Sequence, residues 1–459
     1  MTKSVKKATP VRFHEGLKQL RKDAGGMDIG AREIWVDVGM ENDAEPVRRF
    51  ETFTADLNRM ANWMIDCGIK TVVMESTGVY WIPACQILED RGIEVLLVNP
   101  RYAKNVSGRK TDVLDCQWLR TLHCYGLLPA SFRPVREIVT LRSYLRHRQM
   151  LIEYAAAHIQ HMQKAMTQMN LQLHHVISDI TGLTGMRIIR AIAGGERNCK
   201  KLAGLRHDRT HASEATIEKA LEGDYRAEHL FALKQSLEAF DHYQKQIAEC
   251  DQEIAKHVRS LETKAESGRG LKAARQAKRK KRNQMQFDVR EEAFRISGVD
   301  LTQIDGISGS AALSLISEIG INMSPWPTEK HFASWLTLCP NNKVSGGRVL
   351  KRHTRKSANR ARIILRFCAQ SLFSSRSALG AFCRRMCARL GKPKGVIATA
   401  HKLALLIYRM LKYGRDYADI GQEQYEKQFK ERSLRSLARR AKEFGLQLVS
   451  EPTPEKTVP

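Results

Sequence analysis

Four acidic residues have the types and spacing of a metal-binding centre: Asp37, Glu75, Asp112 and Asp115. Asp37 and Glu75 lie within apolar runs that predict buried strands, where an unpaired charge is costly. Asp112 and Asp115 are three residues apart at the start of a helical pattern and share one helix face, although Asp112 could instead cap that helix. Carboxylate oxygens suit Mg²⁺, and two such ions can hold the attacking and leaving oxygens of a phosphodiester. The set therefore predicts a two-ion Mg²⁺ site.

A second candidate for chemistry is Ser345, which is followed by Gly346, Gly347 and Arg348. The glycines remove bulk beside the hydroxyl, so backbone or DNA could approach closely. Arg348 and the basic residues after it could hold a phosphate and stabilise its charge. A serine that attacks phosphorus forms a phosphoserine link and conserves the bond energy for rejoining. An ordinary turn serine would have the same sequence context, and this alternative stays open.

Alternating strand and helix patterns surround the four carboxylates. Such alternation indicates an α/β sheet covered by helices. In these sheets functional residues gather at strand ends and adjoining helix starts, so the carboxylates have the layout of an RNase H-like nuclease core. Residues 1–30 lack the pattern and are expected to form a loose basic arm. Strands are expected at 34–40, 50–54, 71–74 and 95–98, and helices at 57–67, 81–91 and 112–125.

Two long heptad patterns follow, over residues 141–173 and 230–261. Apolar residues repeat at alternating steps of three and four, which is typical of a coiled-coil seam. Arg148 interrupts the first seam, and Gln244 and Asp251 interrupt the second; such polar residues can set register or pairing. The patterns predict a long antiparallel coiled-coil arm. An oligomer interface and two core helices of an ordinary bundle are the alternatives.

The net charge indicates a polyanionic partner. The chain of 459 residues has 76 Lys and Arg against 49 Asp and Glu, a formal charge of +27. This favours nucleic acid over an anionic membrane surface, and no apolar run approaches the roughly 20 residues of a membrane span. The first residues lack the apolar core of a signal peptide. The ten scattered cysteines then indicate reduced thiols, and we expect a cytoplasmic protein without a membrane partner.

The basic residues concentrate late in the chain. Residues 330–415 contain twenty Lys or Arg and no Asp or Glu, where about ten acids would be expected at average composition. This indicates extended contact with a DNA or RNA backbone. The run 269–282 has eight basic groups and no acid; it could grip phosphates or be a solvated linker. The residues predicted to contact nucleic acid are Lys110, Lys343, Gly346, Gly347, Arg348, Lys351, Arg352, Arg355, Lys356, Arg362 and Arg366.

Residues 301–320 resemble a helix-hairpin-helix motif, in which a glycine turn and a helix start present backbone N–H groups to a phosphate. The spacing of Gly306 and Gly309 fits, although any tight turn between helices could produce it. The predicted organisation is a basic arm (1–30), an α/β catalytic domain (31–135), a coiled-coil arm with a helical connector (136–265), a basic linker (266–295), a mainly α domain with the helix-hairpin-helix and Ser345 (296–420), and a charged helix with a disordered tail (421–459).

Four segments together resemble one known family, the DEDD transposases of bacterial insertion sequences. These are relatives of the Piv invertase and are described as bridge-RNA-guided serine recombinases. The resemblance covers roughly residues 31–415, in the family's order of RuvC-like domain, coiled coil and transposase domain. Cys116 departs from the alanine that the family often has. The segments are Asp37-Val-Gly39, Glu75-Ser-Thr-Gly-Val-Tyr80, Lys110-Thr-Asp-Val-Leu-Asp115 and Pro340-x4-Ser345-Gly-Gly-Arg348.

The resemblance implies roles that the residues alone do not. The four carboxylates would bind Mg²⁺, and Ser345 would attack DNA to form a covalent intermediate. The carboxylates of one subunit and the serine of another would form a composite site, in a homodimer that assembles to a tetramer. A structured guide RNA would pair with the element ends and the target DNA.

Three functions follow from these patterns. The main hypothesis is a site-specific DNA recombinase acting by strand exchange. A RuvC-type structure-selective endonuclease would use the same carboxylates with water as the nucleophile. A non-catalytic nucleic-acid-binding protein with a decayed nuclease fold is the third. Intact acids at all four positions disfavour the third, and Ser345 within a long basic domain disfavours the second.

Overall fold

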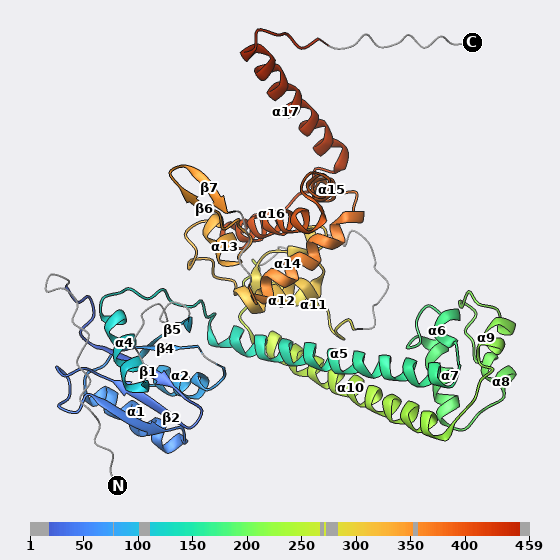
Figure 1. The fold of residues 1–459 in the computed structure, drawn as a ribbon, viewed down its shortest axis with the longest axis horizontal. Helices are drawn as coiled ribbons and strands as arrows, with labels where there is room; N and C mark the ends of the chain where they lie inside the picture. Colours follow the sequence, from blue (N-terminus) through green and yellow to red (C-terminus); the bar gives the residue numbers. More distant parts are fainter. Residues whose placement is uncertain are drawn as a thin grey trace. The chain divides into compact units, whose positions relative to one another are not determined.

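The computed structural model describes residues 18–76, 78–100, 111–266, 270–271, 283–351 and 357–449, without the side chains of Lys343, Val344 and Lys351. The chain divides into two compact units, Met1–Arg133 and Pro134–Pro459. We describe each unit by itself (Figure 1). No helix among these residues has both the length and the apolar character needed to cross a membrane.

The first unit contains a mixed sheet of five strands. The spatial order is β3-β2-β1-β4-β5, with β2 antiparallel to β1 and β3, and with β4 and β5 parallel to β1. This topology is compatible with an RNase H-like domain. The strands are β1 (Ala24–Ile29), β2 (Glu33–Asp37), β3 (Val47–Glu51), β4 (Thr71–Glu75) and β5 (Glu94–Val98).

The central strand β1 lies where we expected a loose arm, so that expectation is wrong for residues 24–29. The segment Ala24-Gly-Gly-Met-Asp-Ile29 has two glycines and an aspartate, which are depleted in strands. Tertiary context overrides this weak propensity, because β1 pairs with β2 on one side and with β4 on the other. Met27 and Ala24 are completely buried.

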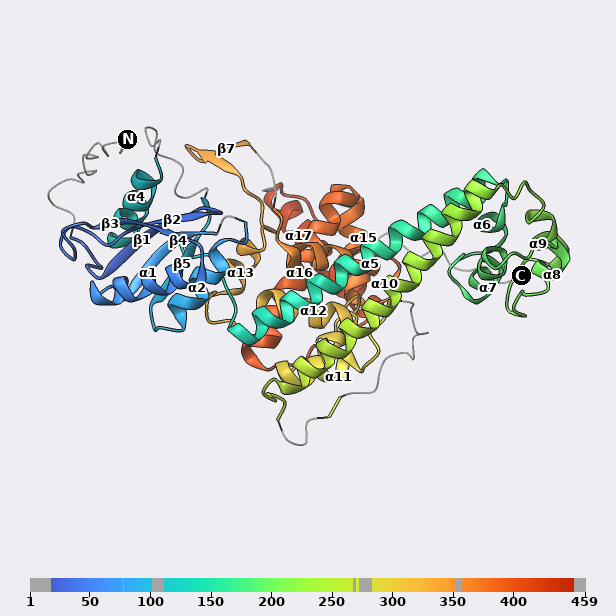
Figure 2. The ribbon, with the colours of Figure 1, turned by 90° about the horizontal axis from the view of Figure 1, so that it is seen from below.

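Helices cover both faces of this sheet, as Figure 2 shows. Helices α1 (Thr54–Asp66) and α2 (Trp81–Glu89) cover one face, where the larger apolar core includes Met27, Met60 and Met74. Helix α4 (Asp112–Cys124) covers the other face, where Val73 and Val98 pack against Trp118, Leu119 and Leu122.

Helix α4 lies close to β1 at one glycine. A Cβ atom at Gly26 would come within 2.3 Å of the carbonyl oxygen of Cys116 and 2.4 Å of the amide nitrogen of Arg120. Both are backbone atoms, so only a residue without a side chain fits between β1 and α4. Packing therefore explains why β1 contains a glycine although glycine disfavours strands: Gly26 leaves the space that α4 needs to cover β1.

The second unit is dominated by two long helices, α5 (Arg136–Gln168) and α10 (Ala227–Ser260), which lie side by side in Figures 1 and 2. They are antiparallel, because His257 forms a hydrogen bond with the Glu137 carbonyl oxygen near one end, and the tilted rings of Tyr154 and Tyr243 are in contact further along, with centroids 5.5 Å apart. The coiled-coil interpretation of this pair stays a prediction. Four short helices lie between them in sequence: α6 (Leu173–Val176), α7 (Leu183–Ala193), α8 (Cys199–Ala203) and α9 (Glu214–Ala220).

The two polar residues that interrupt the heptads contact each other. Arg148 and Asp251 are both buried and form a bidentate ion pair, in which Arg148 Nη2 lies 3.2 Å from Asp251 Oδ2. Arg148 Nη2 also donates to the Asn283 carbonyl oxygen at 3.1 Å. A buried pair with complete hydrogen bonding tolerates few shifts in register, so it aligns the two helices.

The remaining elements form a mainly helical part of the second unit. Helix α16 packs against α13, α14 and α15, and its buried Tyr408 donates a hydrogen bond to the Trp326 carbonyl oxygen at 2.7 Å. The elements are α11 (Val289–Ser297), η1 (Leu301–Gln303), α12 (Gly309–Ile319), α13 (Glu329–Trp335), β6 (Lys343–Ser345), β7 (Arg348–Lys351), α14 (Arg360–Ser371), η2 (Leu372–Ser374), α15 (Ala378–Leu390), α16 (Lys392–Tyr413) and α17 (Gln422–Glu443).

Packing within the unit accounts for the glycine turn at Gly306. This residue has φ +86°, and a Cβ atom there would lie 2.7 Å from the Cys368 carbonyl oxygen of α14. Ser308 caps α12 by accepting a hydrogen bond from the Ala311 amide. These contacts need no phosphate, and the helix-hairpin-helix interpretation stays a prediction.

Candidate active site

Asp28, at the end of β1, is surrounded by three of the predicted acidic residues. The register pairs Met27 with Met74 on the parallel strand β4, so Asp28 and Glu75 come next on neighbouring strands and face the same side. Burial, followed by repulsion from Asp112, Asp115 and Glu75, raises the pKa of Asp28 to about 6; a hydrogen bond with the Ile29 amide opposes the rise. We call these four residues the acidic end of the sheet.

The direction of α4 brings Asp112 and Asp115 to this end. Near the end of α4, His123 forms a 2.9 Å hydrogen bond with Thr71, the first residue of β4. Helix α4 is therefore antiparallel to β1 and β4, and its first turn lies at the carboxyl ends of those strands. Thr111 is the N-cap, because its hydroxyl accepts from the Leu114 amide at 3.3 Å. Thr111, and not Asp112, therefore caps α4, which decides the alternative that the sequence left open.

Asp37 has a different environment from the one we expected. It pairs with Gly26 across the β1–β2 ladder, and its Oδ1 accepts a hydrogen bond from the Gly39 amide at 3.0 Å. Burial raises its pKa, Arg120 and the Gly39 amide oppose this, and Glu41 adds a smaller rise. Besides burial, the main influences on the pKa of Asp37 come from Arg120, Gly39 and Glu41, whereas those on Asp28 include Asp112, Asp115 and Glu75. The structure thus brings together three of the four predicted carboxylates, with Asp28 in place of Asp37.

Arg120 explains the Asp37-Val-Gly39 motif. Its Nε donates to the Ala24 carbonyl oxygen at 2.9 Å, and its Nη2 forms an ion pair with Glu41. Gly39 has φ +90°, and a Cβ atom there would lie 2.1 Å from Arg120 Nη2. The motif therefore makes room for a buried arginine. We call Asp37, Arg120, Thr71 and His123 the anchor end, because they join the last turns of α4 to the sheet.

A sequence signal for Asp28 exists. Asp28-Ile-Gly30 has the same form as Asp37-Val-Gly39, nine residues earlier. The Gly30 amide donates to the Glu33 carbonyl oxygen at 3.0 Å, which closes a tight turn between β1 and β2. Two Asp-x-Gly segments separated by a turn indicate a hairpin, and this repeat is the signal by which the sequence could have pointed to Asp28 as well as Asp37. The glycine-rich context of 24–30 obscured it.

The acidic end has the donor atoms that divalent cations prefer. Four carboxylates supply hard oxygen ligands, and a cation would relieve the repulsion that raises the pKa of Asp28. Across the part of the chain that the structure describes, however, no group of three or more His, Cys, Asp or Glu side chains is already arranged to hold an ion. The residue types fit a divalent metal, whereas a converged ligand set is not preformed.

Ser345 lies at the tip of the hairpin formed by β6 and β7. It pairs with Arg348 across a two-residue turn of Gly346 and Gly347, and both of these pairing residues are exposed. The glycines have φ +54° and +75°, as a two-residue turn requires at both positions. A Cβ atom at either would meet nothing within 4 Å. The turn, rather than close packing inside the protein, accounts for both glycines.

The other predicted nucleic-acid contacts are only partly visible. Arg362 and Arg366 lie on one side of α14: burial lowers the pKa of Arg362, and Arg366 lowers it further. Lys343 and Lys351 lie in β6 and β7, and their side chains are not described. Four predicted residues lie outside the described residues, namely Lys110, Arg352, Arg355 and Lys356.

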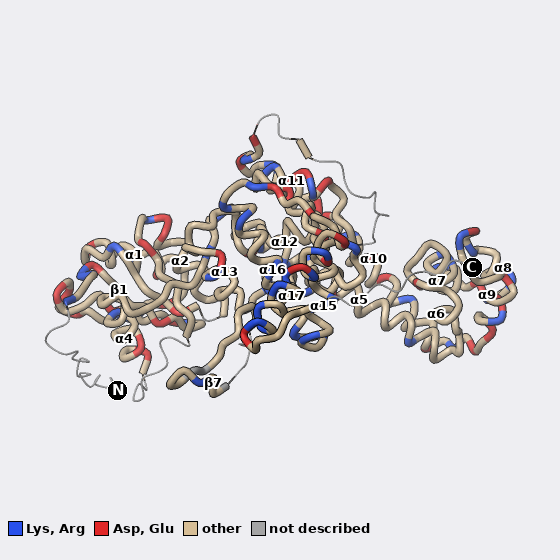
Figure 3. The backbone as a smooth tube through the Cα atoms, turned by 90° about the horizontal axis from the view of Figure 1, so that it is seen from above, with Lys and Arg blue, Asp and Glu red and all other residues tan. Residues whose placement is uncertain are grey.

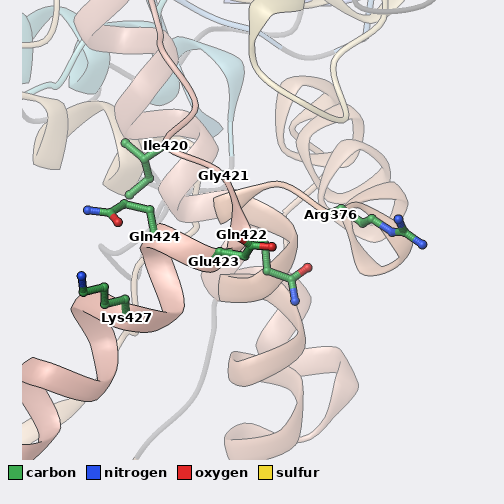
Figure 4. A pocket seen from close by; sticks show the side chains of 7 residues that line it. All are labelled: Arg376, Ile420, Gly421, Gln422, Glu423, Gln424 and Lys427. Carbon is green, nitrogen blue, oxygen red and sulfur yellow. The ribbon is translucent and has the colours of Figure 1, made fainter.

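An open pocket in the second unit contains none of the predicted site residues. It is lined by Arg376, before α15, and by six residues at or just before the start of α17, namely Ile420, Gly421, Gln422, Glu423, Gln424 and Lys427. In Figure 4 the side chains of Arg376 and Lys427 point in opposite directions. They do not converge on one ligand, so this pocket does not extend the candidate site.

Comparison with protein families identifies the class. Residues 25–171 match a family model described as a transposase, of the DEDD type, and residues 300–384 match one described as a transposase of the IS116/IS110/IS902 family. The chain is therefore a DNA transposase, an enzyme class that acts on DNA. It belongs to the IS110 family of DEDD transposases. A comparison with curated proteins found no match.

The first family model begins at residue 25, so it includes β1 and Asp28. Transposases of the DEDD type generally use divalent metals. The first match contains nearly the whole sheet and all of α5, so it extends from the first unit into the second. The second match runs from η1 to the middle of α15 and lies within the second unit.

Proposed function

We propose that this transposase cuts and rejoins DNA with a two-ion Mg²⁺ site held by Asp28, Glu75, Asp112 and Asp115, and with Ser345 as the nucleophile. The observation that carries the metal site is the repulsion that Asp28 experiences from the other three acids. A half-buried acid repelled by three other acids is unfavourable unless a cation is its partner, and this favours a metal site over a structural one.

Bound Mg²⁺ would supply charge stabilisation for the phosphate during displacement. The protein's own contribution is positional. The ends of β1 and β4 hold Asp28 and Glu75 on one face, and the Thr111 cap fixes the first turn of α4, which carries Asp112 and Asp115. A sheet and a capped helix are rigid supports, so they hold the backbone of the four acids in place while the side chains adjust to an ion.

The serine step is written as a balanced displacement. The Ser345 Oγ forms a bond to phosphorus, the bond from phosphorus to one deoxyribose oxygen breaks, and the serine proton passes to that leaving oxygen through solvent or a base. Rejoining reverses the step: a hydroxyl of another DNA strand attacks phosphorus and releases Ser345. The exposed hairpin tip and the facing Arg348 support this role, since both can approach a phosphate from outside the protein.

The oligomer and the RNA belong to the same proposal. A homodimer that assembles to a tetramer would combine carboxylates and serine from different subunits, and a structured RNA would choose the element ends and target. The formal charge of +27 and the acid-free stretch 330–415 support binding of more than one polyanion. Measuring the ratio of absorbance at 260 and 280 nm in the purified protein, followed by sequencing of any RNA, tests this part.

The decisive experiment compares three variants on supercoiled DNA that carries the element ends. Asp28→Asn should abolish Mg²⁺-dependent cleavage, Asp37→Asn should retain it, and Ser345→Ala should form no covalent protein–DNA adduct. If Ser345→Ala still exchanges strands, the serine mechanism is wrong. If it cleaves without rejoining, water is the nucleophile, as in a structure-selective endonuclease. Wild-type cleavage in EDTA would disprove the metal site.

A further inference from the structure

Arg385 of α15 lies in an aromatic cage that α17 completes. The guanidinium carbon is 3.7 Å from the ring centroid of Phe429, 4.9 Å from that of Tyr425 and 5.8 Å from that of Phe382. Phe429 and Tyr425 belong to α17, and Phe382 belongs to α15. A cation stacked on ring faces is stabilised by the negative charge of the ring faces. This contact therefore helps to attach α17 to α15.

The cage leaves polar groups unpaired. Nε and Nη1 of Arg385 and the hydroxyl of Tyr425 are buried and have no hydrogen-bond partner. The guanidinium and the hydroxyl are close enough for an interaction of the hydrogen-bond type to raise the pKa of Arg385 and lower that of Tyr425, although these atoms do not meet the full distance and angle geometry of a hydrogen bond. Buried donors without partners are unfavourable, and charged donors more so. The site is therefore short of an acceptor.

The surroundings are cationic. Burial lowers the pKa of Arg385, Tyr425 opposes this, and Arg432 and Arg389 lower it further. Lys402 of α16 is close by, with Nζ 5.5 Å from the Phe382 ring. Within the described ranges, none of these four basic side chains forms an ion pair. Figure 3 shows Lys and Arg along α15, α16 and α17 in blue. The missing acceptor would be an anion.

Helix α17 buries little of its surface against the rest of the second unit. No residue of α17 is buried, and Phe429 is 41% exposed. The start of the helix is held separately, because Arg384 Nη2 donates to Gln422 Oε1 at 2.8 Å and the Ala378 amide donates to Asp419 at 3.1 Å. Further along α17, Tyr425 and Phe429 contact Arg385 of α15 through their ring faces.

We propose that Arg385, with Arg389, Lys402 and Arg432, is a binding site for a nucleic-acid phosphodiester, and that the rings of α17 cover this site until a phosphate displaces them. Arg385 then donates from Nε and Nη1 to phosphate oxygens in the forked geometry that arginine favours. The inference rests on the proposed function only in taking DNA or RNA as the polyanion; it does not involve the carboxylates or Ser345.

The test measures binding in EDTA, where cleavage is absent. The probes are a fluorescent DNA duplex of about 30 base pairs and an RNA duplex of the same length, which span a site of this kind. Arg385→Met keeps an apolar chain against the rings and removes the charge; binding should fall roughly tenfold, and the slope of log K against log salt should fall by about one. Arg385→Lys should restore much of the loss. Loss with DNA alone, RNA alone or both identifies the source of the phosphate.

Phe429→Ala tests the cover, since it leaves every charge in place. Removing the ring should tighten binding roughly threefold to tenfold and should increase tryptic cleavage in α17. Leu437→Ala is the matched control, an exposed apolar residue of the same helix without contact to Arg385. The gain from Phe429→Ala should vanish in the Arg385→Met background. The proposal is wrong if Arg385→Met binds both probes like wild type, or if the gain persists without Arg385.

Discussion

Asp28 and Asp37 lie on neighbouring strands and face the same side of one sheet, yet their neighbours have opposite charge. Gly26 pairs with Asp37, and Asp28 follows Gly26 by two residues, so both aspartates point towards α4. Three acids surround Asp28, whereas Arg120 and the Gly39 amide stabilise Asp37. Burial of an acid therefore does not by itself mark an active site. The charge of the neighbouring groups distinguishes the acidic end, where they are negative, from the anchor end, where Arg120 is positive.

One helix serves both ends. The first turn of α4 carries Asp112 and Asp115, and its later turns carry Arg120 and His123. The anchor end fixes the height and rotation of α4 on the sheet, and the acidic end depends on that placement. Changes at the acidic end should therefore affect catalysis without lowering stability, whereas changes at the anchor end should do the reverse.

The largest effect is expected for Asp28→Asn. Mg²⁺-dependent cleavage should fall by roughly 10²–10³-fold or more, because a metal ligand is lost. The melting temperature should not fall, because the amide removes repulsion with three acids. Plasmid cleavage and thermal unfolding of the same preparation measure both. Cleavage within threefold of wild type would remove Asp28 from the proposed site.

Gly26→Ala should disturb both ends at once. The new Cβ atom would overlap α4 backbone atoms at 2.3 and 2.4 Å, so the helix must shift. We expect a loss of about 1–3 kcal/mol in stability and roughly tenfold or more in cleavage. Gly25→Ala is the control, because its Cβ would come within 3.2 Å of only the flexible end of Met64. Equal effects from the two substitutions would contradict the close approach of α4 to β1.

His123 should make the anchor end sensitive to acid. Burial, with Arg21 adding to it and Asp23 opposing it, lowers the pKa of His123 to about 4 from 6.5. The unfolded chain therefore binds the proton more tightly, so stability is fully present above pH 6.5 and is lost as the pH falls towards 4. The loss should be about 2 kcal/mol by pH 5. Chemical denaturation at several pH values measures it, and His123→Gln should flatten this part of the profile.

The smallest effect is expected for Asp37→Asn. Arg120 keeps Glu41 and the Ala24 carbonyl oxygen as partners, so the cost should be about 1 kcal/mol. Cleavage at 25 °C should stay within threefold of wild type. A loss of cleavage as deep as that of Asp28→Asn, without a fall in melting temperature, would show that Asp37 is catalytic and would remove the distinction between the two ends.

Much of the local structure could be predicted from the sequence. Periodicity located four of the five strands of the sheet, its covering helices, and the long pair α5 and α10. The heptad breaks also identified Arg148 and Asp251, which contact each other. These predictions succeed because amphipathic spacing reports which side of an element is buried, and a charge within an apolar seam needs a partner nearby.

The exact membership of the acidic site could not be predicted in the same way. From the residue types and the Asp112–Asp115 spacing, the sequence predicted a cluster of acids in the α/β domain. From composition, it predicted a basic region within the second unit. The choice between Asp28 and Asp37 was decided only by tertiary structure. Both aspartates begin an Asp-x-Gly segment, so the local sequence does not distinguish them. Their environments differ because Gly26 of the central strand β1 lets α4 pack closely, and because α4 is antiparallel to β1 and β4. The acids at the start of α4 therefore lie near Asp28, and Arg120 near its end lies near Asp37.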